Sequence, residues 1–180
     1  MSASRVSLLV ALVLLVVASI AHADPRLGAH DLPTLFYVAK SDDRNRVDYG
    51  VRLDEQCAPR SFAPVFAYWR RFEPGQPPLG DLSMLDQRGY GIAHQAVRVS
   101  EQSGSWIELR LRALPDRTLL ALVQPVGDRC VGSAQLEIAG EQAVLDHVFV
   151  RLDGPMRVRE IELHGQARDT GRELVERLRP

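Results

Sequence analysis

Lysine is almost absent from this chain, in which Lys40 is the only lysine among 22 basic residues. The 23 acidic residues balance the basic ones, and the net charge is −1. Without an excess of positive charge the chain has little with which to neutralise phosphate groups. This excludes a broad electrostatic footprint for nucleic acid or for an anionic membrane surface. We therefore expect no nucleic-acid partner.

The sequence motifs of the common enzyme classes are also missing. The chain has no G-x-S-x-G nucleophile elbow, no H-E-x-x-H zinc helix, no G-x-x-x-x-G-K-[ST] phosphate loop and no G-x-G-x-x-G dinucleotide fingerprint. The histidines after residue 23 are not paired at the short spacing of metal ligands, and they are His30, His94, His147 and His164. No catalytic residue, metal or cofactor is predicted, and enzymatic activity stays an open question.

One neighbouring pair of a catalytic type occurs at Asp146 and His147. The residues around them are expected to form a strand, in which successive side chains point to opposite faces of the sheet. On this pattern the carboxylate and the imidazole are expected to point apart and to form no dyad with each other.

Long apolar runs are confined to the beginning of the chain. Residues 6–20 are apolar except for two serines, and Arg5 precedes them. Ala21 and Ala23 follow at the positions that signal peptidase reads. The run is shorter than the roughly 20 apolar residues of a spanning helix, so we expect cleavage before Asp24 rather than an uncleaved anchor.

These features predict a cleavable signal peptide at residues 1–23. The remaining residues, 24–180, have a length that suits a single domain with its own core. No cysteine follows the apolar run, which argues against a lipid-modified N-terminus. We expect a periplasmic or secreted protein that keeps no stable membrane anchor after cleavage.

The chain contains only two cysteines, Cys57 and Cys130. In the oxidising compartment that export implies, an isolated pair is most simply a disulfide. Two thiols without a neighbouring histidine do not complete the four ligands of a tetrahedral metal site. We predict a disulfide, with two free buried thiols as the alternative.

Most of the chain after the signal peptide has a hydrophobic period of two, which is typical of strands with one buried face. Residues 47–54 and 107–113 alternate without interruption, and the pattern of residues 130–138 turns Cys130 towards the core. Further strands are expected at 34–39, 65–69, 119–126, 144–152, 157–165 and 173–178, the last of which could instead be a short helix. About nine short strands with one short helix predict a mainly β fold, an antiparallel β-sandwich or barrel.

The helix is expected behind the proline-rich residues 73–78, which cannot hold regular structure. Asp81 is the expected N-cap, and Gly89 is expected to end the helix. The residues predicted to face inward are Leu82, Met84 and Leu85.

The most polar local segment lies between the first two expected strands, at residues 40–46. It is either a binding loop that offers backbone amides and cations to an anionic or carbohydrate group, or a solvated hairpin turn rich in turn-forming Asp and Asn. Farther along, an exposed Trp69 could stack on a sugar or a partner, although core and rim packing is the commoner role of such aromatics. Ligand contacts are predicted for Lys40, Ser41, Arg44, Asn45, Tyr68, Trp69, Tyr90 and His94.

Residues spread over the chain resemble the pattern of an uncharacterised exported bacterial family, the domain of unknown function 4833. The matching residues are Leu35, Phe36, Tyr37, Val38, Ser41, Asn45, Val47, Tyr49, Pro64, Tyr68, Trp69, Tyr90, Gly91, Ile92, Gly165, Thr170, Gly171 and Glu173. The resemblance covers about residues 31–178. Asp42 and Asp43 stand where the family usually has Lys or Asn, so shared loop chemistry does not follow. The resemblance implies an exported domain and no mechanism.

Three functional hypotheses follow. The first is a soluble envelope protein that binds an unknown envelope ligand or protein without catalysis, through residues 40–46 and the region from Tyr68 to Tyr90. The second is an unrecognised hydrolase of envelope material, which requires His94 or His147 within hydrogen-bond reach of a carboxylate and a nucleophile. The third is a structural or assembly role, in which an exposed sheet edge or apolar patch contacts a partner.

Overall fold

A computed structural model of the protein describes residues 32–100, 104–154 and 157–179. The predicted signal peptide and His30 lie outside these residues, so the signal peptide stays a prediction. Within the described part of the chain, no helix is both long enough and apolar enough to cross a membrane.

The described residues form a mainly β fold with one short helix, α1 (Met84–Tyr90), as the hydrophobic period predicted. The strands are β1 Thr34–Lys40, β2 Asp43–Val51, β3 Val65–Arg70, β4 Leu79–Asp81, β5 Ile92–Ser100, β6 Gly104–Leu111, β7 Leu114–Val126, β8 Arg129–Ile138, β9 Glu141–Leu152, β10 Val158–Ala167 and β11 Glu173–Leu178. The nine expected strands are present, and β4 and β5 are additional. The last segment is a strand paired with β10, so the strand expected at 173–178 is confirmed over its alternative, a short helix.

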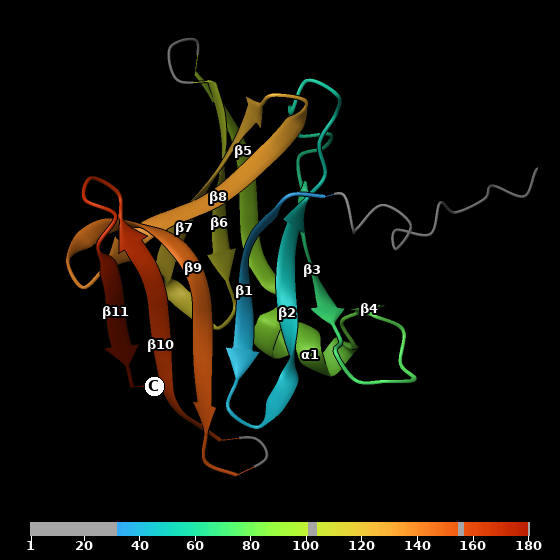
Figure 1. Cartoon of the computed structure of the whole chain (residues 1–180), viewed down its shortest axis with the longest axis vertical. Coiled ribbons are helices and arrows are strands. Elements are labelled where there is room, and N and C mark those ends of the chain that lie inside the picture. Colours follow the sequence, from blue (N-terminus) through green and yellow to red (C-terminus); the bar gives the residue numbers. More distant parts are fainter. Residues whose placement is uncertain (1–31, 101–103, 155–156, 180) are drawn as a thin grey trace, which may run out of the picture.

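The strands belong to one large sheet in the order β4-β3-β2-β1-β9-β8-β7-β6-β5, with β10 and β11 attached beside β9. β9 is the junction, because its first half pairs with β8 and its second half pairs with β1, while β10 follows it along nearly its whole length. The sheet therefore folds into two layers (Figure 1) and is not closed into a barrel. The front layer contains β1, β2, β3, β9, β10 and β11, and the back layer contains β5 to β8. The pairing is antiparallel except between β1 and β9, which corrects the expectation of a purely antiparallel sheet.

The hydrophobic core lies between the two layers. β2 contributes Val47, Tyr49 and Val51 from the front, and β6 contributes Ile107, Leu109 and Leu111 from the back. Where β3 and β5 approach each other, the Gln95 side chain hydrogen-bonds both the N–H and the carbonyl of Val65, at 2.9 and 3.0 Å. This amide takes the place of a strand partner and satisfies two backbone groups.

The helix α1, Met84–Tyr90, lies at one open end of the two layers (Figure 1). Its N-cap is Ser83, which forms a reciprocal capping box with Asp86, so the predicted cap at Asp81 was wrong. The helix also continues past Gly89 to Tyr90, whose carbonyl accepts a 2.6 Å hydrogen bond from the Tyr49 hydroxyl.

The predicted inward face of the helix was right only in part. Leu82 is buried, whereas Met84 and Leu85 are largely exposed, because the helix is short and is held at its ends rather than along one apolar face.

The predicted disulfide between Cys57 and Cys130 is present. It joins the connection between β2 and β3 to the start of β8, and so links the front layer to the back layer across 73 positions of sequence. A disulfide is consistent with an extracellular or periplasmic location.

Candidate functional site

One row of side chains crosses six strands on the outer face of the front layer, opposite to the core. The register pairs Asp48 with Tyr68 and Tyr37, His147 with Tyr37 and His164, and His164 with Val175. The row thus reads, from β3 to β11, Tyr68, Asp48, Tyr37, His147, His164 and Val175. We call these six residues the outer row.

The rings at the centre of the outer row stack on one another. The Tyr37 and His147 rings are 5.0 Å apart and 5° from parallel, and the His147 and His164 rings are 4.4 Å apart and 7° from parallel. On the other side of Tyr37, the Arg46 guanidinium lies 4.2 Å from the ring centroid. These separations are close to the 4.7–4.9 Å spacing of strands in a sheet. Rings that lie opposite one another on neighbouring strands are therefore at a suitable distance to stack.

Asp146 and His147 point to the same side of the sheet, which corrects the prediction that they point apart. His147 Nδ1 lies 2.8 Å from Asp146 Oδ2. The cause is a register shift in which His164 pairs with His147 but Gly165 pairs with Leu145, so that Asp146 is an extra residue in β9. Such a β-bulge interrupts the alternation of side chains and re-aims them locally.

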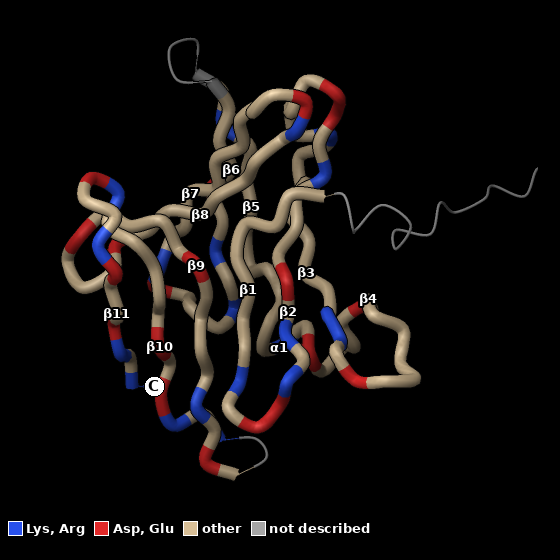
Figure 2. Tube along the Cα trace, in the orientation of Figure 1, with Lys and Arg blue, Asp and Glu red and all other residues tan. Residues whose placement is uncertain are grey.

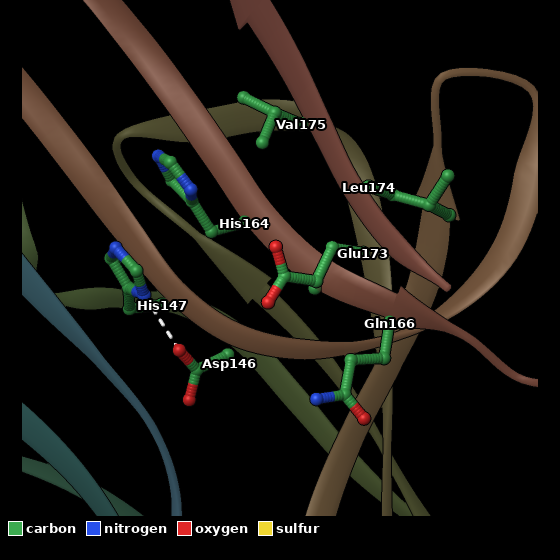
Figure 3. Close-up of a pocket in the computed structure, with 8 residues that line it drawn as sticks. Asp146, His147, His164, Gln166, Glu173, Leu174 and Val175 are labelled. Atoms are coloured by element: carbon green, nitrogen blue, oxygen red, sulfur yellow. Dashed lines mark hydrogen bonds and ion pairs between the residues drawn. The ribbon is translucent and has the colours of Figure 1, made fainter. Parts of the chain in front are cut away.

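An open hollow adjoins the two histidines, where β9, β10 and β11 lie side by side (Figure 3). Polar groups from three strands surround it: two carboxylates, two imidazoles and one amide, with an apolar wall at one side. The labelled lining residues are Asp146, His147, His164, Gln166, Glu173, Leu174 and Val175. The hollow could accept hydroxyl groups of a ligand, because carboxylate and amide oxygens are strong hydrogen-bond acceptors.

Two buried carboxylates, Asp48 and Glu162, lie on either side of the stacked rings, with 0% and 4% of their surface exposed. Each is covered by two arginines. Arg46 and Arg70 donate to Asp48 at 2.7 and 2.5 Å, and Glu162 Oε1 lies 3.0 Å from Arg151 and 3.3 Å from Arg177. Charged residues of both signs accordingly gather over β2, β9 and β10 in the front layer (Figure 2).

Opposing effects act on the pKa of Glu162. Desolvation raises it, but hydrogen bonds from Arg151 and His164 and the charge of Arg177 outweigh desolvation, so the pKa lies below its usual 4.5. A carboxyl with a lowered folded-state pKa stabilises the fold above the unfolded-state value, and this contribution is lost as the pH falls through the folded-state pKa.

We therefore expect Glu162→Gln to be less stable than the wild type near neutral pH, and the difference to shrink as the solution is acidified below about pH 4.5. Thermal unfolding of both proteins between about pH 7 and about pH 3 measures this difference. A difference in Tm that stays constant over the range would contradict the assignment of Glu162 as an ionised partner of the arginines.

Burial also affects Tyr37 at the centre of the outer row. Desolvation and, next, the negative charge of Asp146 raise its pKa, and the neighbouring Arg46 opposes them. The phenol therefore stays protonated at neutral pH and offers a hydroxyl that can donate and accept.

Three of the predicted contact residues come together elsewhere, at the end of the molecule covered by α1. Lys40 Nζ lies 5.9 Å from the Trp69 ring, and Trp69 packs edge-on against Tyr90 at 5.7 Å. The indole N–H donates to Asp86 at 3.1 Å, and Lys40 also pairs with Asp43 at 3.3 Å. Desolvation opposes ionisation of Asp86, but its hydrogen bonds from Ser83 and Trp69, together with the charge of Lys40, lower its pKa.

The other predicted contact residues are dispersed. Ser41 Oγ accepts a hydrogen bond from the Leu152 N–H at 3.1 Å, and Asn45 Oδ1 accepts one from the Phe72 N–H at 3.0 Å, so both side chains fix the backbone of neighbouring segments. Of the remaining three, Arg44 is exposed in β2, Tyr68 is buried in the outer row, and His94 is exposed on β5. Whether any of the eight predicted residues contacts a ligand stays a prediction.

The stacked row was not predicted from the sequence. The strands expected at 144–152 and 157–165 are neighbours along the chain, but counting outwards from residues 153–155 places His147 opposite Ile161 rather than His164. The register of β9 and β10 shifts between Val158 and Glu160, which a simple count does not anticipate. The stacking of Tyr37 on His147 was equally hidden, because β1 and β9 are far apart in sequence and pair in parallel.

Within the described ranges, no group of three or more His, Cys, Asp and Glu side chains lies close enough to hold a metal ion. His147 does lie beside a carboxylate, as the hydrolase hypothesis required, and an Nδ1–H donated to Asp146 leaves Nε2 free as an acceptor. However, none of the described residues that line the hollow carries a hydroxyl or a thiol as a nucleophile.

Comparison with known proteins gives one positive result. Residues 36–177 match the family described as Domain of unknown function (DUF4833). Searches among curated proteins and among solved structures returned no match. The match covers most of the chain and spans every strand of the outer row from β1 to β11. The resemblance read from the sequence is therefore confirmed, and the chain belongs to the DUF4833 family.

Proposed function

We propose that the protein is an exported, non-catalytic binding domain that holds a hydroxyl-rich ligand of the cell envelope on the outer face of its front layer. The predicted signal peptide and the disulfide between Cys57 and Cys130 support a place in the periplasm or outside the cell. The ligand would lie across the outer row and reach into the hollow beside β10.

The observation that carries this proposal is the stacked arrangement of Tyr37, His147 and His164 beside the hollow. Their rings restrain one another, so little side-chain freedom remains to be lost when a ligand binds. The side chains of His147 and His164 are 22% and 28% exposed, which leaves room for contact from solvent. Rigid amphipathic rings beside a few convergent polar groups are typical of ligand sites.

Hydrolysis is a second candidate function, favoured by the hydrogen bond between His147 and Asp146. In that case His147 would act as a general base on a water molecule, with Asp146 orienting the ring. Binding is the better supported of the two, because the hollow is open to solvent and supplies neither a nucleophile nor an enclosed site for a reacting group.

Calorimetric titration tests the proposal, with soluble peptidoglycan fragments and envelope oligosaccharides as the probes. We expect a member of this panel to bind the wild type and to bind His164→Ala about tenfold more weakly, because one ring and its hydrogen-bonding edge are lost.

His94→Ala is the matched control, since His94 is an exposed strand histidine on β5, outside the outer row. It is expected to bind as the wild type does. The proposal fails if no member of the panel binds, or if the two alanine variants weaken binding equally. Release of a cleaved product that His147→Gln abolishes would support hydrolysis instead.

A further inference from the structure

We propose that Arg46 and Arg70 form an oxyanion subsite on the outer face, which holds a carboxylate or phosphate group of the ligand. This inference rests on the proposed function and adds to it the charge of the ligand and the place where that charge is bound.

The two arginines lie directly opposite each other on β2 and β3. Like charges in this position destabilise a sheet, and here one carboxylate between them offsets the repulsion. Asp48 accepts from Arg46 Nε through Oδ1 and from Arg70 Nε through Oδ2. One buried carboxylate thus fixes the positions of two guanidinium groups.

The Nη donors of the two arginines, which do not bind Asp48, are suited to an anion. A guanidinium group has five N–H donors in a planar fork, and the hydrogen bonds to Asp48 come from Nε of each arginine. Arg70 Nη2 also lies 3.4 Å from the Tyr68 hydroxyl, a long contact. The remaining Nη groups can take two oxygens of one carboxylate or phosphate side by side, which is the geometry in which arginine binds these groups.

Two aromatic rings lie against the guanidinium of Arg46. The Tyr37 ring lies at 4.2 Å and the Phe72 ring at 5.7 Å from Cζ. Phe72 is itself restrained, because its N–H donates to Asn45 Oδ1 at 3.0 Å. Asn45, predicted as a ligand contact, is in this account a positioning residue that acts through Phe72.

The exposed atoms of this cluster are cationic. The side chains of Arg46 and Arg70 are 31% and 25% exposed, whereas Asp48 is fully buried beneath them. Asp81, exposed on β4, is opposite Tyr68 in the register and is the next carboxylate along the sheet. An anion approaching from solvent therefore meets guanidinium groups before it meets Asp48.

The cluster around Glu162 provides a contrast within the same face. Arg151 lies 3.0 Å from Glu162 and also 3.4 Å from Glu160, and Arg177 lies 3.3 Å from Glu162. Two arginines there share two carboxylates, whereas Arg46 and Arg70 share Asp48. The Asp48 cluster is consequently the better place for an added anion.

The test is a titration of the whole mature protein, followed by the NMR signals of the arginine Nε–H groups. Sodium phosphate and sodium acetate are added separately at constant ionic strength, with sodium chloride as the reference salt. We expect the signals of Arg46 and Arg70 to shift in a saturable way with phosphate, acetate or both, and this comparison identifies the preferred oxyanion. Arg98, which pairs with Glu108 at 3.0 Å on the back layer, is the internal control and is expected to stay unchanged.

A variant separates the geometry of the fork from its charge. Arg46→Lys keeps the positive charge but not the planar pair of donors, and we expect it to bind the preferred anion about tenfold more weakly. Shifts that do not saturate, that equal those of Arg98, or that Arg46→Lys leaves unchanged would overturn the subsite. If the subsite fails while envelope oligosaccharides still bind, the proposed function stands; if the anions bind and no oligosaccharide does, the proposed function fails and the subsite stands.

Discussion

Simultaneous replacement of Cys57 and Cys130 by serine is expected to lower the free energy of unfolding by about 4 kcal/mol. The two residues are 73 positions apart, so the disulfide closes a long loop and restricts the unfolded chain strongly. The enclosed segment contains β3 to β7 with α1, and the bond also links the front layer to the back layer. For a chain of this length the change corresponds to a fall in Tm on the order of 10 °C.

Urea unfolding of the wild type and the double variant, each with and without a reducing agent, measures this effect. The reducing agent should lower the midpoint of the wild type to that of the variant and should leave the variant unchanged. Equal midpoints of the two proteins without a reducing agent would show that the bond does not stabilise the fold.

Substitution of the buried carboxylate Asp48 by alanine is expected to cost about 3 kcal/mol of folding free energy, because removing one partner of a buried ion pair leaves the others uncompensated. Arg46 and Arg70 would then oppose each other across β2 and β3 without a counter-charge. We place the cost at the lower end of the usual range, since both arginines are partly exposed and can turn towards water.

Asp128→Ala is the matched control for this substitution. Asp128 is 95% exposed and lies 3.9 Å from Arg129, and pairs of this kind contribute roughly 0–1 kcal/mol. Chemical unfolding of the three proteins gives the comparison. A loss for Asp48→Ala no larger than that for Asp128→Ala would mean that the buried carboxylate does not organise the two arginines.

The strands were predictable because their side chains alternate in sequence. The alternation in residues 47–54 identified β2 and placed Val47, Tyr49 and Val51 on one buried face. The sheet order was not predictable, since the parallel pairing of β1 with β9 joins segments more than 100 positions apart. Turn residues report only on neighbouring strands, and nothing in a single strand indicates a distant partner.

The outer face was the least predictable part of the molecule. Alternation assigns Asp48 to the polar side of β2, which suggests exposure, yet the residue is fully buried because two arginines from β2 and β3 cover it. Asp146 and His147 were expected to point apart, and a single extra residue in β9 brings them together. Both outcomes depend on contacts between strands that the local pattern does not encode.

The predicted binding residues show a related limit. Lys40, Trp69 and Tyr90 do meet, as a polar and aromatic segment of this kind suggested, but they surround Asp86 at the end of the core. Residue type alone could not distinguish such a cluster from the centre of the outer row, where tyrosine and histidine rings from three strands stack. The hollow lined by His147 and His164 lies beside the outer row, and for this reason the proposed site differs from the predicted one.

The most direct test of the central claim is a map of where the ligand binds. Amide NMR spectra of the mature protein would be recorded while oligosaccharides released from the native cell envelope are added. Binding at the outer face predicts saturable shifts around Tyr37, Asp48, His147 and His164, with little change on β5 and β6. Saturable shifts confined to another surface, or no saturable shift at all, would contradict the account.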